Sequence, residues 1–182
     1  MPKAADPKAK LTDAALKLLA KTRWSELTLA AVAKSAKVPL ASLPSLIGGK
    51  PELVGLILRR LGDETAKRYR SDAQSATRDR VFDVAMTWFD AANTHKPALR
   101  SMFEGLARDP LSVLSARSKL GAAANWLLTL AEADTGSAVA LRGLLLTGAM
   151  ARALPVWFDD GPDMAKTMAR LDGDLRKGER LF

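Results

Sequence analysis

Apolar residues near the N-terminus recur at steps of three and four, the spacing of one face of an amphipathic helix. The first stripe consists of Leu11, Ala14, Ala15, Leu18 and Leu19. The second stripe follows Thr28, a residue type that caps helix N-termini, and consists of Leu29, Val32, Ala33 and Ala36. Pro39 ends this helix because the residue before a proline is kept out of helical geometry. A third short stretch follows and directs Leu40, Leu43, Leu46 and Ile47 inward.

The second and third stretches have the pattern of a helix-turn-helix, in which the later helix enters the major groove of DNA. The third stretch, however, offers few groups that read bases. Between Pro39 and Ile47 there is no Arg, Lys, Asn or Gln, so contacts to base edges would fall to Ser42 and Ser45. Pro44 also lies inside this stretch, where a proline removes a backbone hydrogen bond and distorts a helix.

The rest of the chain shows helical periodicity and no sustained alternation of the kind found in strands. A long helix is expected from Pro51 towards Ala73, and later helices are expected near Val81, at Pro97 and after Pro110. The last two are expected over about 137–157 and 162–179, with Pro162 at the first position of the second. The sequence therefore predicts an all-α fold of about nine helices. Residues 1–50 would form a three-helix head and residues 51–182 a larger helical bundle.

Several positions of the head carry a family resemblance. They are Ala14, Ala15, Leu18, Thr28, Val32, Ala33, Ala36, Val38, Leu43, Lys50 and Leu53. With these residues the segment resembles the DNA-binding domain of TetR-family transcriptional regulators. The family usually has glycine where this chain has Arg23 and Lys37, and an aromatic cluster where it has residues 44–47. The resemblance implies a cytoplasmic regulator that binds double-stranded DNA as a homodimer and responds to a small ligand.

The charge distribution favours the same function. The 182-residue chain has a net charge of +8. Residues 1–50 carry nine Lys and Arg against three Asp and Glu (+6), whereas residues 51–182 carry nineteen against seventeen (+2). The alternative is that these lysines only solvate outer helix faces. The predicted DNA contacts, with Lys3, Lys8 and Lys10 in a flexible basic arm, are Lys3, Lys8, Lys10, Thr28, Lys37, Ser42, Ser45 and Lys50.

Two further sets of residues are candidates for assembly and ligand binding. The resemblance implies a dimer interface on the last two helices, formed by Leu141, Leu144, Leu145, Met164, Met168, Leu171 and Leu175. The alternative is that these apolar stripes pack only within one protomer. It also implies an apolar ligand cavity, for which the candidate lining residues are Trp88, Phe89, Phe103, Trp126, Met150 and Trp157. The same aromatic residues would equally fill a helical core. Arg100, Arg142 and Arg152 are candidates to pair with an anionic end of an otherwise apolar or amphipathic ligand.

Composition argues against enzymatic, metal and membrane functions. The chain has no cysteine and one histidine, His95, which has no nucleophile motif around it, so no enzyme activity, metal or cofactor is expected. The longest apolar tract, residues 141–158, is interrupted by Arg142, Arg152 and Pro155, and no signal-peptide pattern begins the chain. A cytoplasmic protein without stable membrane insertion is expected.

A second resemblance supplies an alternative function. Residues 157–172 are similar to the closing segment of the TetR-like lipid-binding proteins that assist ubiquinone biosynthesis, which keep the fold without reading DNA. Such a protein would need no base-reading residues, and its basic head would face an anionic membrane surface. Those proteins normally end in a further amphipathic helix, for which this sequence shows no additional pattern after residue 179. A lipid- or quinone-binding accessory protein therefore remains the alternative to a DNA-binding regulator.

Overall fold

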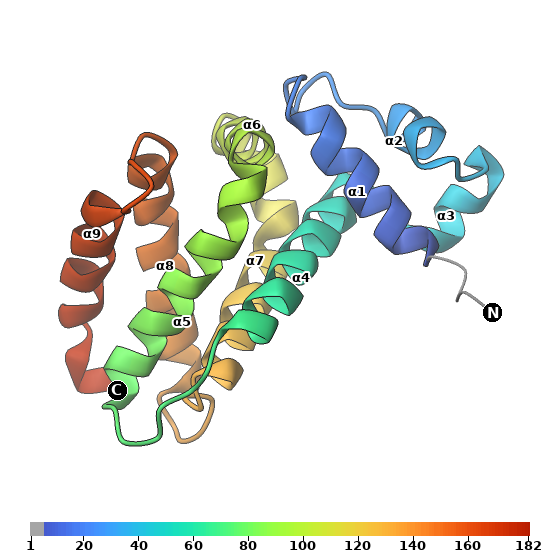
Figure 1. Ribbon diagram of the computed structural model, residues 1–182. Helices are drawn as coiled ribbons and strands as arrows, with labels where there is room; N and C mark the ends of the chain where they lie inside the picture. The colour runs from blue at the N-terminus through green and yellow to red at the C-terminus, as the bar shows by residue number, and fades with distance from the viewer. Residues whose placement is uncertain (1–5) are drawn as a thin grey trace. The chain divides into compact units, whose positions relative to one another are not determined.

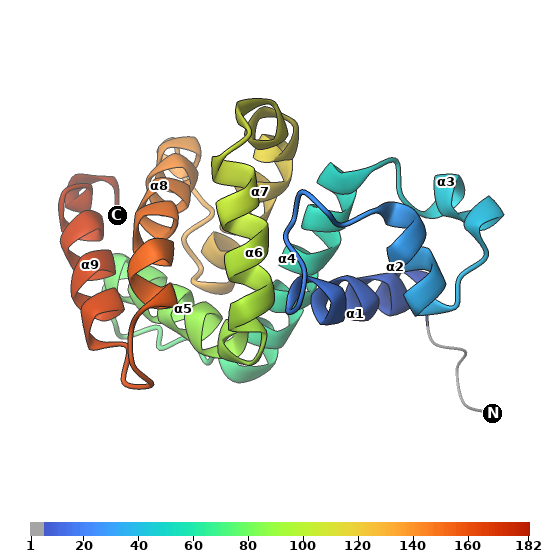
Figure 2. The ribbon, with the colours of Figure 1, turned by 90° about the horizontal axis from the view of Figure 1, so that it is seen from above.

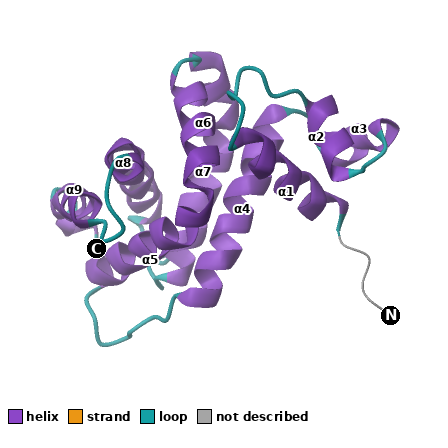
Figure 3. Ribbon diagram, turned by 45° about the horizontal axis from the view of Figure 1, so that its top comes forward, coloured by secondary structure: helices purple, strands orange, loops and turns teal. Residues whose placement is uncertain are grey.

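The computed structural model describes residues 6–182, and these residues form helices with no strand (Figures 1 and 3). The α-helices are α1 (Pro7–Leu19), α2 (Leu29–Ala36), α3 (Leu43–Leu46), α4 (Lys50–Arg68), α5 (Thr77–Ala92), α6 (Lys96–Ala107), α7 (Pro110–Leu130), α8 (Val139–Phe158) and α9 (Ala165–Arg176). Short 3₁₀ turns cover Leu40–Ser42 (η1), Asn93–His95 and Glu179–Leu181. The predicted all-α fold is confirmed.

The chain divides into two compact units. Unit 1 comprises the chain up to Arg60 together with Thr94–Lys119, and unit 2 comprises Leu61–Asn93 and Leu120–Phe182. This division differs from the predicted boundary after residue 50, because the start of α4, all of α6 and the first half of α7 group with the N-terminal helices. Periodicity shows which face of a helix is buried, but it does not show which helix covers that face.

Unit 1 is built around α1, which packs on both α2 and α6 (Figure 2). The predicted stripes form its core, with Leu11, Ala15 and Val32 completely buried. Helix α1 begins earlier than expected: the side chain of Asp6 caps it by accepting a hydrogen bond from the backbone N–H of Lys8 (3.0 Å). Lys8 and Lys10 therefore lie on the exposed side of α1, and the prediction that they belong to a flexible arm is wrong. Lys3 lies outside the described residues.

Unit 2 has an aromatic centre. Helix α9 packs on α8 and α5, and the buried rings of Phe89 and Trp157 lie 5.5 Å apart between their centroids. The indole N–H of Trp157 donates a hydrogen bond to the Asn93 side-chain oxygen (3.2 Å), which satisfies the one polar atom of this ring. Helix α4 enters the unit with Gly62, where an added Cβ would lie 2.7 Å from Trp126 Cδ1.

Helix α9 begins later than the sequence suggests. Its N-cap is Met164, in a left-handed conformation, so the prediction that Pro162 opens this helix is wrong. The cause is Asp160, whose carboxylate accepts hydrogen bonds from the backbone N–H (2.7 Å) and the hydroxyl (2.8 Å) of Thr167. The Thr167 backbone hydrogen bond also lowers the pKa of Asp160. This contact supplies the first turn of α9 with an acceptor for one of its free backbone N–H groups.

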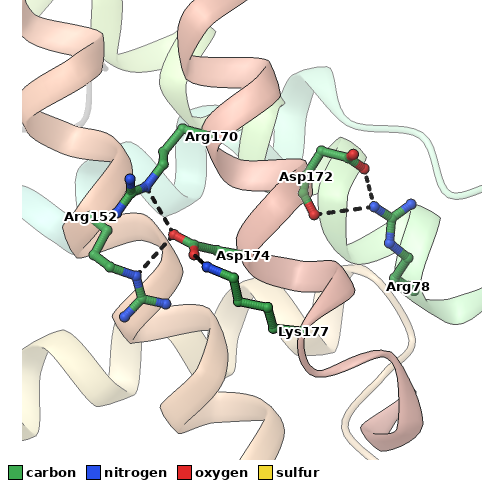
Figure 4. A network of polar contacts seen from close by, with 6 residues as sticks. All are labelled: Arg78, Arg152, Arg170, Asp172, Asp174 and Lys177. Atoms are coloured by element: carbon green, nitrogen blue, oxygen red, sulfur yellow. Dashed lines mark hydrogen bonds and ion pairs between the residues drawn. The ribbon is translucent and has the colours of Figure 1, made fainter.

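One buried carboxylate joins α8 to α9 (Figure 4). Asp174 is 2% exposed, and its oxygens accept hydrogen bonds from Arg152 Nε (2.9 Å), Arg170 Nε (3.1 Å) and Lys177 Nζ (3.0 Å). The hydrogen bond from Arg152 is the largest of the effects that lower the pKa of Asp174 to about 2. Beside this network, Arg78 of α5 pairs with Asp172 of α9. Charge pairing therefore holds α9 on both of its neighbours.

The Asp174 network predicts acid sensitivity. Because the folded-state pKa is about 2 and the ordinary value is 3.8, the carboxylate contributes stability above about pH 4 that is lost as the pH falls towards 2. At neutral pH, Asp174→Asn should lower the free energy of unfolding by about 2 kcal/mol in urea titrations. Asp63→Asn, at an exposed position of α4, should change it little. A gap between Asp174→Asn and wild type that stays constant from pH 7 to pH 2 would contradict this role.

Candidate nucleic-acid interface

The helix-turn-helix begins at Thr28, as predicted. The hydroxyl oxygen of Thr28 accepts a hydrogen bond from the backbone N–H of Ala31 (3.1 Å), which caps α2. Val32, Ala33 and Ala36 face inward and are buried. The Thr28 hydroxyl proton and the first backbone N–H groups of α2 remain at an exposed helix N-terminus, which is an arrangement that suits an anion.

The turn after α2 places a lysine in an unfavourable conformation. Lys37 is left-handed (φ 55°, ψ 37°), and the backbone N–H of Val38 bonds back to the Ala33 carbonyl (3.0 Å). Glycine is the usual residue at such a position, because a Cβ costs about 1 kcal/mol there. Arg23, the other position where the TetR family usually has glycine, is not in the left-handed region. Lys37 thus presents an exposed cation at a position that glycine would satisfy more easily.

The third element is short and divided. The 3₁₀ turn η1 runs into the four-residue α3, with Pro44 in its first turn. Leu43 and Ile47 are buried as predicted, but Leu40 is 61% exposed, so its inward placement is wrong. Leu40 belongs to the 3₁₀ turn and Leu43 begins α3, so the two leucines do not share one α-helical phase. Ser42 and Ser45 are exposed, and the Ser45 hydroxyl donates to the Ser42 carbonyl (2.8 Å), leaving mainly its oxygen to accept.

The predicted contact residues therefore occupy different elements. Thr28, Lys37, Ser42 and Ser45 all lie exposed on the helix-turn-helix, whereas Lys8 and Lys10 lie on α1. Lys34 was not among the predicted contacts, yet it is exposed on α2, one turn before Lys37. Its signal in the sequence was its place on the polar side of the second apolar stripe. Lys34 and Lys37 together make the turn of the helix-turn-helix basic.

Lys50 has a different environment from the other predicted contacts. Its ammonium group donates a hydrogen bond to the Trp24 carbonyl (2.9 Å) and lies 5.2 Å from the centroid of the Trp24 ring. Partial burial lowers the pKa of Lys50. Lys50 therefore ties the start of α4 to the loop between α1 and α2, and its role includes holding that loop in place.

Trp24 is the centre of this loop, and sequence analysis did not single it out. The indole is buried against Gly105 of α6, where an added Cβ would lie 2.7 Å from Trp24 Cδ1 and 2.8 Å from Cγ. Nearby, the Ser101 hydroxyl of α6 donates to the Thr22 carbonyl (2.8 Å). We call Trp24, Gly105 and Lys50 the Trp24 anchor. A single large aromatic residue in an otherwise polar inter-helix segment was the available signal.

The predicted ligand-binding residues divide between the two units. Trp88, Phe89 and Trp157 are buried in unit 2 and pack ring against ring, with Trp88 edge-on to Phe89 at 5.3 Å. In the same unit, Met150 is half-buried and Trp126 is 42% exposed. Phe103 is half-buried in unit 1. The three buried rings thus act as core. Among the described residues, no three His, Cys, Asp or Glu side chains gather to hold a metal ion.

The predicted dimer residues also differ from one another in burial. Leu141 and Leu144 of α8 are 54% and 67% exposed, and Met168 of α9 is exposed as well. Leu171 and Leu175 are completely buried inside unit 2, so their assignment to an interface between protomers is wrong. Leu145 packs against Gly178, and Met164 Sδ accepts a hydrogen bond from Asn93 Nδ2 (3.8 Å). Both contacts lie within unit 2. Periodicity identifies the apolar stripe of α9, but it does not show whether that stripe packs inside unit 2 or against a second protomer.

Helix α8 is long and apolar enough to cross a membrane, by length and composition alone. Its two arginines are both engaged within unit 2. Arg152 bonds to Asp174, and Arg142 Nη1 donates to the carbonyls of Ala133 (3.0 Å) and Thr135 (2.9 Å). Arg142 also donates to the Leu181 carbonyl. The arginines thus serve to join α8 to neighbouring segments.

Comparison with known proteins shows the fold. No protein-family model and no curated protein matches the sequence. A TetR transcriptional regulator from Nitrosomonas europaea is similar with a TM-score of 0.68 at 19% identity, covering 95% of this chain and 98% of that one. A TetR transcriptional regulator from Rhodococcus sp. RHA1 is similar with a TM-score of 0.68 at 16% identity, covering 94% of each chain. A TetR-family regulator from Streptomyces coelicolor is similar with a TM-score of 0.55 at 20% identity, covering 94% of this chain and 83% of that one. The chain has the TetR fold over nearly its whole length.

The Trp24 anchor predicts an unequal response to two glycine substitutions. Gly105→Ala places a methyl group against the indole and should lower the free energy of unfolding by about 1–3 kcal/mol. Gly121→Ala, in α7, meets no atom within 4 Å and should raise it by up to about 1 kcal/mol, since alanine favours helix. Urea titrations of both variants measure the difference. Equal stability of the two variants would rule out tight packing of Trp24 on α6.

Proposed function

We propose that this protein is a DNA-binding transcriptional regulator. The observation that carries the proposal is the helix-turn-helix of unit 1, which has a capped second helix and a basic turn at Lys34 and Lys37. Its third element, buried through Leu43 and Ile47, supports the same function. The near-complete coverage of three TetR regulators by this chain adds support at the level of the fold. In a helix-turn-helix the third element would enter the major groove.

Contacts to the DNA backbone would provide most of the affinity. The exposed N-terminus of α2 offers the Thr28 hydroxyl and backbone N–H groups to one phosphate. Lys34 and Lys37 offer two cations at the other end of the same helix, and Lys8 and Lys10 add two more from α1. Binding of this kind releases counterions and therefore depends steeply on salt.

Reading of bases would be limited by the third element. Its exposed side chains are those of Leu40, Ala41, Ser42, Pro44 and Ser45, none of which forms a two-point contact to a base edge. The exposed Leu40 suits an apolar contact with a thymine methyl group, and the two hydroxyls accept or donate single hydrogen bonds. We therefore expect modest sequence specificity with a preference for sites that carry thymine opposite Leu40.

A homodimer is the second part of the proposal. On α8 the exposed residues Leu141, Leu144, Ala151 and Pro155 fall on one stripe with near-heptad spacing. On α9 the exposed Ala165, Met168 and Ala169 form a matching apolar strip. Helix α8 packs on α9, and we call the exposed apolar strips of these two helices together the α8–α9 face. Exposed leucine and methionine side chains grouped in this way are typical of a self-association site.

The alternative function is favoured by one specific observation. A lipid- or quinone-binding accessory protein would leave its third helix without base-reading side chains, which is what the segment from Leu40 to Ile47 shows. In that case the exposed lysines would bind anionic vesicles, and DNA fragments would compete for them without sequence preference. The regulator instead predicts that selection from genomic DNA enriches particular fragments.

Substituting Lys37 by glycine separates DNA binding from folding. Lys37→Gly relieves the left-handed strain and should raise the free energy of unfolding by about 1 kcal/mol. It also removes one phosphate contact, so the slope of log K against log salt for an enriched genomic fragment should become shallower by about 0.9. Fluorescence anisotropy across a salt series measures both affinity and slope.

Lys67→Gln is the matched control, because it removes a charge at an exposed position of α4 in unit 2. It should leave affinity and slope unchanged. A Lys37→Gly variant that is more stable and binds the fragment with the wild-type affinity and slope would overturn the proposed interface, since greater stability removes unfolding as an explanation.

A further inference from the structure

Unit 1 contains an open groove of about 820 Å³ beside the Trp24 anchor, which we call the α6 groove. One wall is the end of α1 and the following loop, residues 19–26, and the other wall is one side of α6 from Pro97 to Arg108. A volume of several hundred Å³ is sufficient for a small organic molecule. None of the aromatic residues predicted to bind a ligand lines this groove.

The α6 groove combines a mixed lining with a basic rim. Its accessible apolar residues are the exposed Ala20 and Pro97 and the half-buried Gly105, whereas Leu19 and Trp24 are almost fully buried in its wall. Its charged lining residues are four cations and two anions: Lys21, Arg23, Arg100 and Arg108 against Glu26 and Glu104. This excess of positive charge around an apolar surface favours an amphipathic anion over a neutral or cationic molecule.

The ion pairs along α6 are weak enough to rearrange around a bound anion. Glu104 pairs with one arginine a helical turn away on either side. Its Oε1 lies 3.8 Å from Arg100 Nη1 and its Oε2 lies 3.5 Å from Arg108 Nη2. Glu104 and both arginines are more than a third exposed, and surface pairs of this kind contribute little to stability. A carboxylate placed near the rim would therefore gain two guanidinium partners at small cost.

The walls of the groove, in contrast, are held firmly. Trp24 cannot move towards α6 because Gly105 already contacts its ring, and Lys50 fixes the Trp24 carbonyl from the other side. The hydrogen bond from Ser101 to the Thr22 carbonyl joins the two walls directly. A groove with fixed walls binds a rigid ligand without first having to order itself.

We propose that the α6 groove binds a small organic anion with a flat apolar body. The apolar body lies on Ala20 and Pro97 in the groove that Trp24 also lines, and the carboxylate lies at the rim, where Arg100 and Arg108 turn from Glu104 towards it. If the protein binds DNA as proposed above, such a ligand acts on the helix-turn-helix directly, because the loop that forms one wall leads into the Thr28 cap of α2. The binding step itself does not depend on that function.

The probe for this site is 1-naphthoate, with the neutral 1-naphthamide as the matched ligand. Calorimetric titration of the full chain should show one naphthoate per protomer and naphthamide bound about tenfold more weakly, since only the anion pairs with the arginines. With 5-fluorotryptophan incorporated, the ¹⁹F resonance of Trp24 should shift on binding. The resonances of the buried Trp88 and Trp157 should not.

Two double variants test the arginines. Arg100→Gln with Arg108→Gln should weaken naphthoate binding by about tenfold, to the level of naphthamide. Arg59→Gln with Arg117→Gln removes the same charge from exposed positions of unit 1 outside the groove and should leave binding unchanged. Far-ultraviolet circular dichroism checks that both double variants remain folded.

The proposal is overturned if naphthoate does not bind at millimolar concentration, if both double variants bind it as the wild type does, or if the shifted resonance belongs to Trp88, Trp126 or Trp157. These outcomes are independent of DNA. A protein that binds naphthoate in the groove but enriches no genomic fragment would keep this inference and reject the proposed function. A protein that enriches a genomic fragment but does not bind naphthoate would keep the proposed function and reject the ligand site in the α6 groove.

Discussion

The contact between the Trp24 ring and the bare backbone of Gly105 is the constraint on which the head of this protein depends. It brings the loop after α1 against α6, at a position where no other amino acid leaves room for the ring. Lys50 and Ser101 then fix the carbonyl groups of that loop. Because the loop leads directly into the Thr28 cap, this contact fixes the segment from which α2 starts, and the packing of α2 on α1 then sets the position of the basic turn.

In unit 2, the buried carboxylate of Asp174 fixes the position of α9 on α8. Asp174 orients α9 on α8 through Arg152, so Leu171 and Leu175 turn inward and Met168 stays at the surface. The same arrangement leaves the apolar side of α8 uncovered. The α8–α9 face is therefore a consequence of the contacts inside unit 2: the arginines of α8 bond within the unit, and Leu141 and Leu144 stay exposed.

Much of the fold could be predicted from the sequence because helix periodicity and capping are local properties. The stripes at Leu11, Val32 and Leu53, the Thr28 cap and the run of α-helices follow from spacing and residue type. The differences between the predictions and the structure have a common cause, which is tertiary contact between segments far apart in the sequence. The grouping of α6 with the head, the inward turn of Leu171 and the delayed start of α9 each depend on a partner that is not a sequence neighbour.

The candidate site was predicted in outline only. Thr28, Lys37, Ser42 and Ser45 were placed on the helix-turn-helix by pattern and resemblance, and they lie exposed there. Lys50 was assigned to phosphate, but its contact with Trp24 arises across 26 residues of chain, which spacing cannot show. Leu40 was expected in the core because residues 40–47 were expected to form one helical stretch, whereas a 3₁₀ turn precedes α3. The α6 groove involves two segments about 80 residues apart, so the sequence pointed only to Arg100 as a partner for an anionic ligand and not to the groove itself.

The proposed regulator requires two protomers, joined through their α8–α9 faces, to bind one DNA fragment together. Sedimentation of the wild type and of Leu144→Asp, alone and with a fragment enriched from genomic DNA, tests this directly. Leu144 is 67% exposed, so the variant should fold normally, and Leu111→Asp at another exposed leucine is the control. We predict a wild-type dimer, two protomers per fragment, and a monomeric Leu144→Asp protein that binds the fragment about 100-fold more weakly. A monomeric wild type at micromolar concentration, or a Leu144→Asp variant that binds as tightly as the control, would contradict the account.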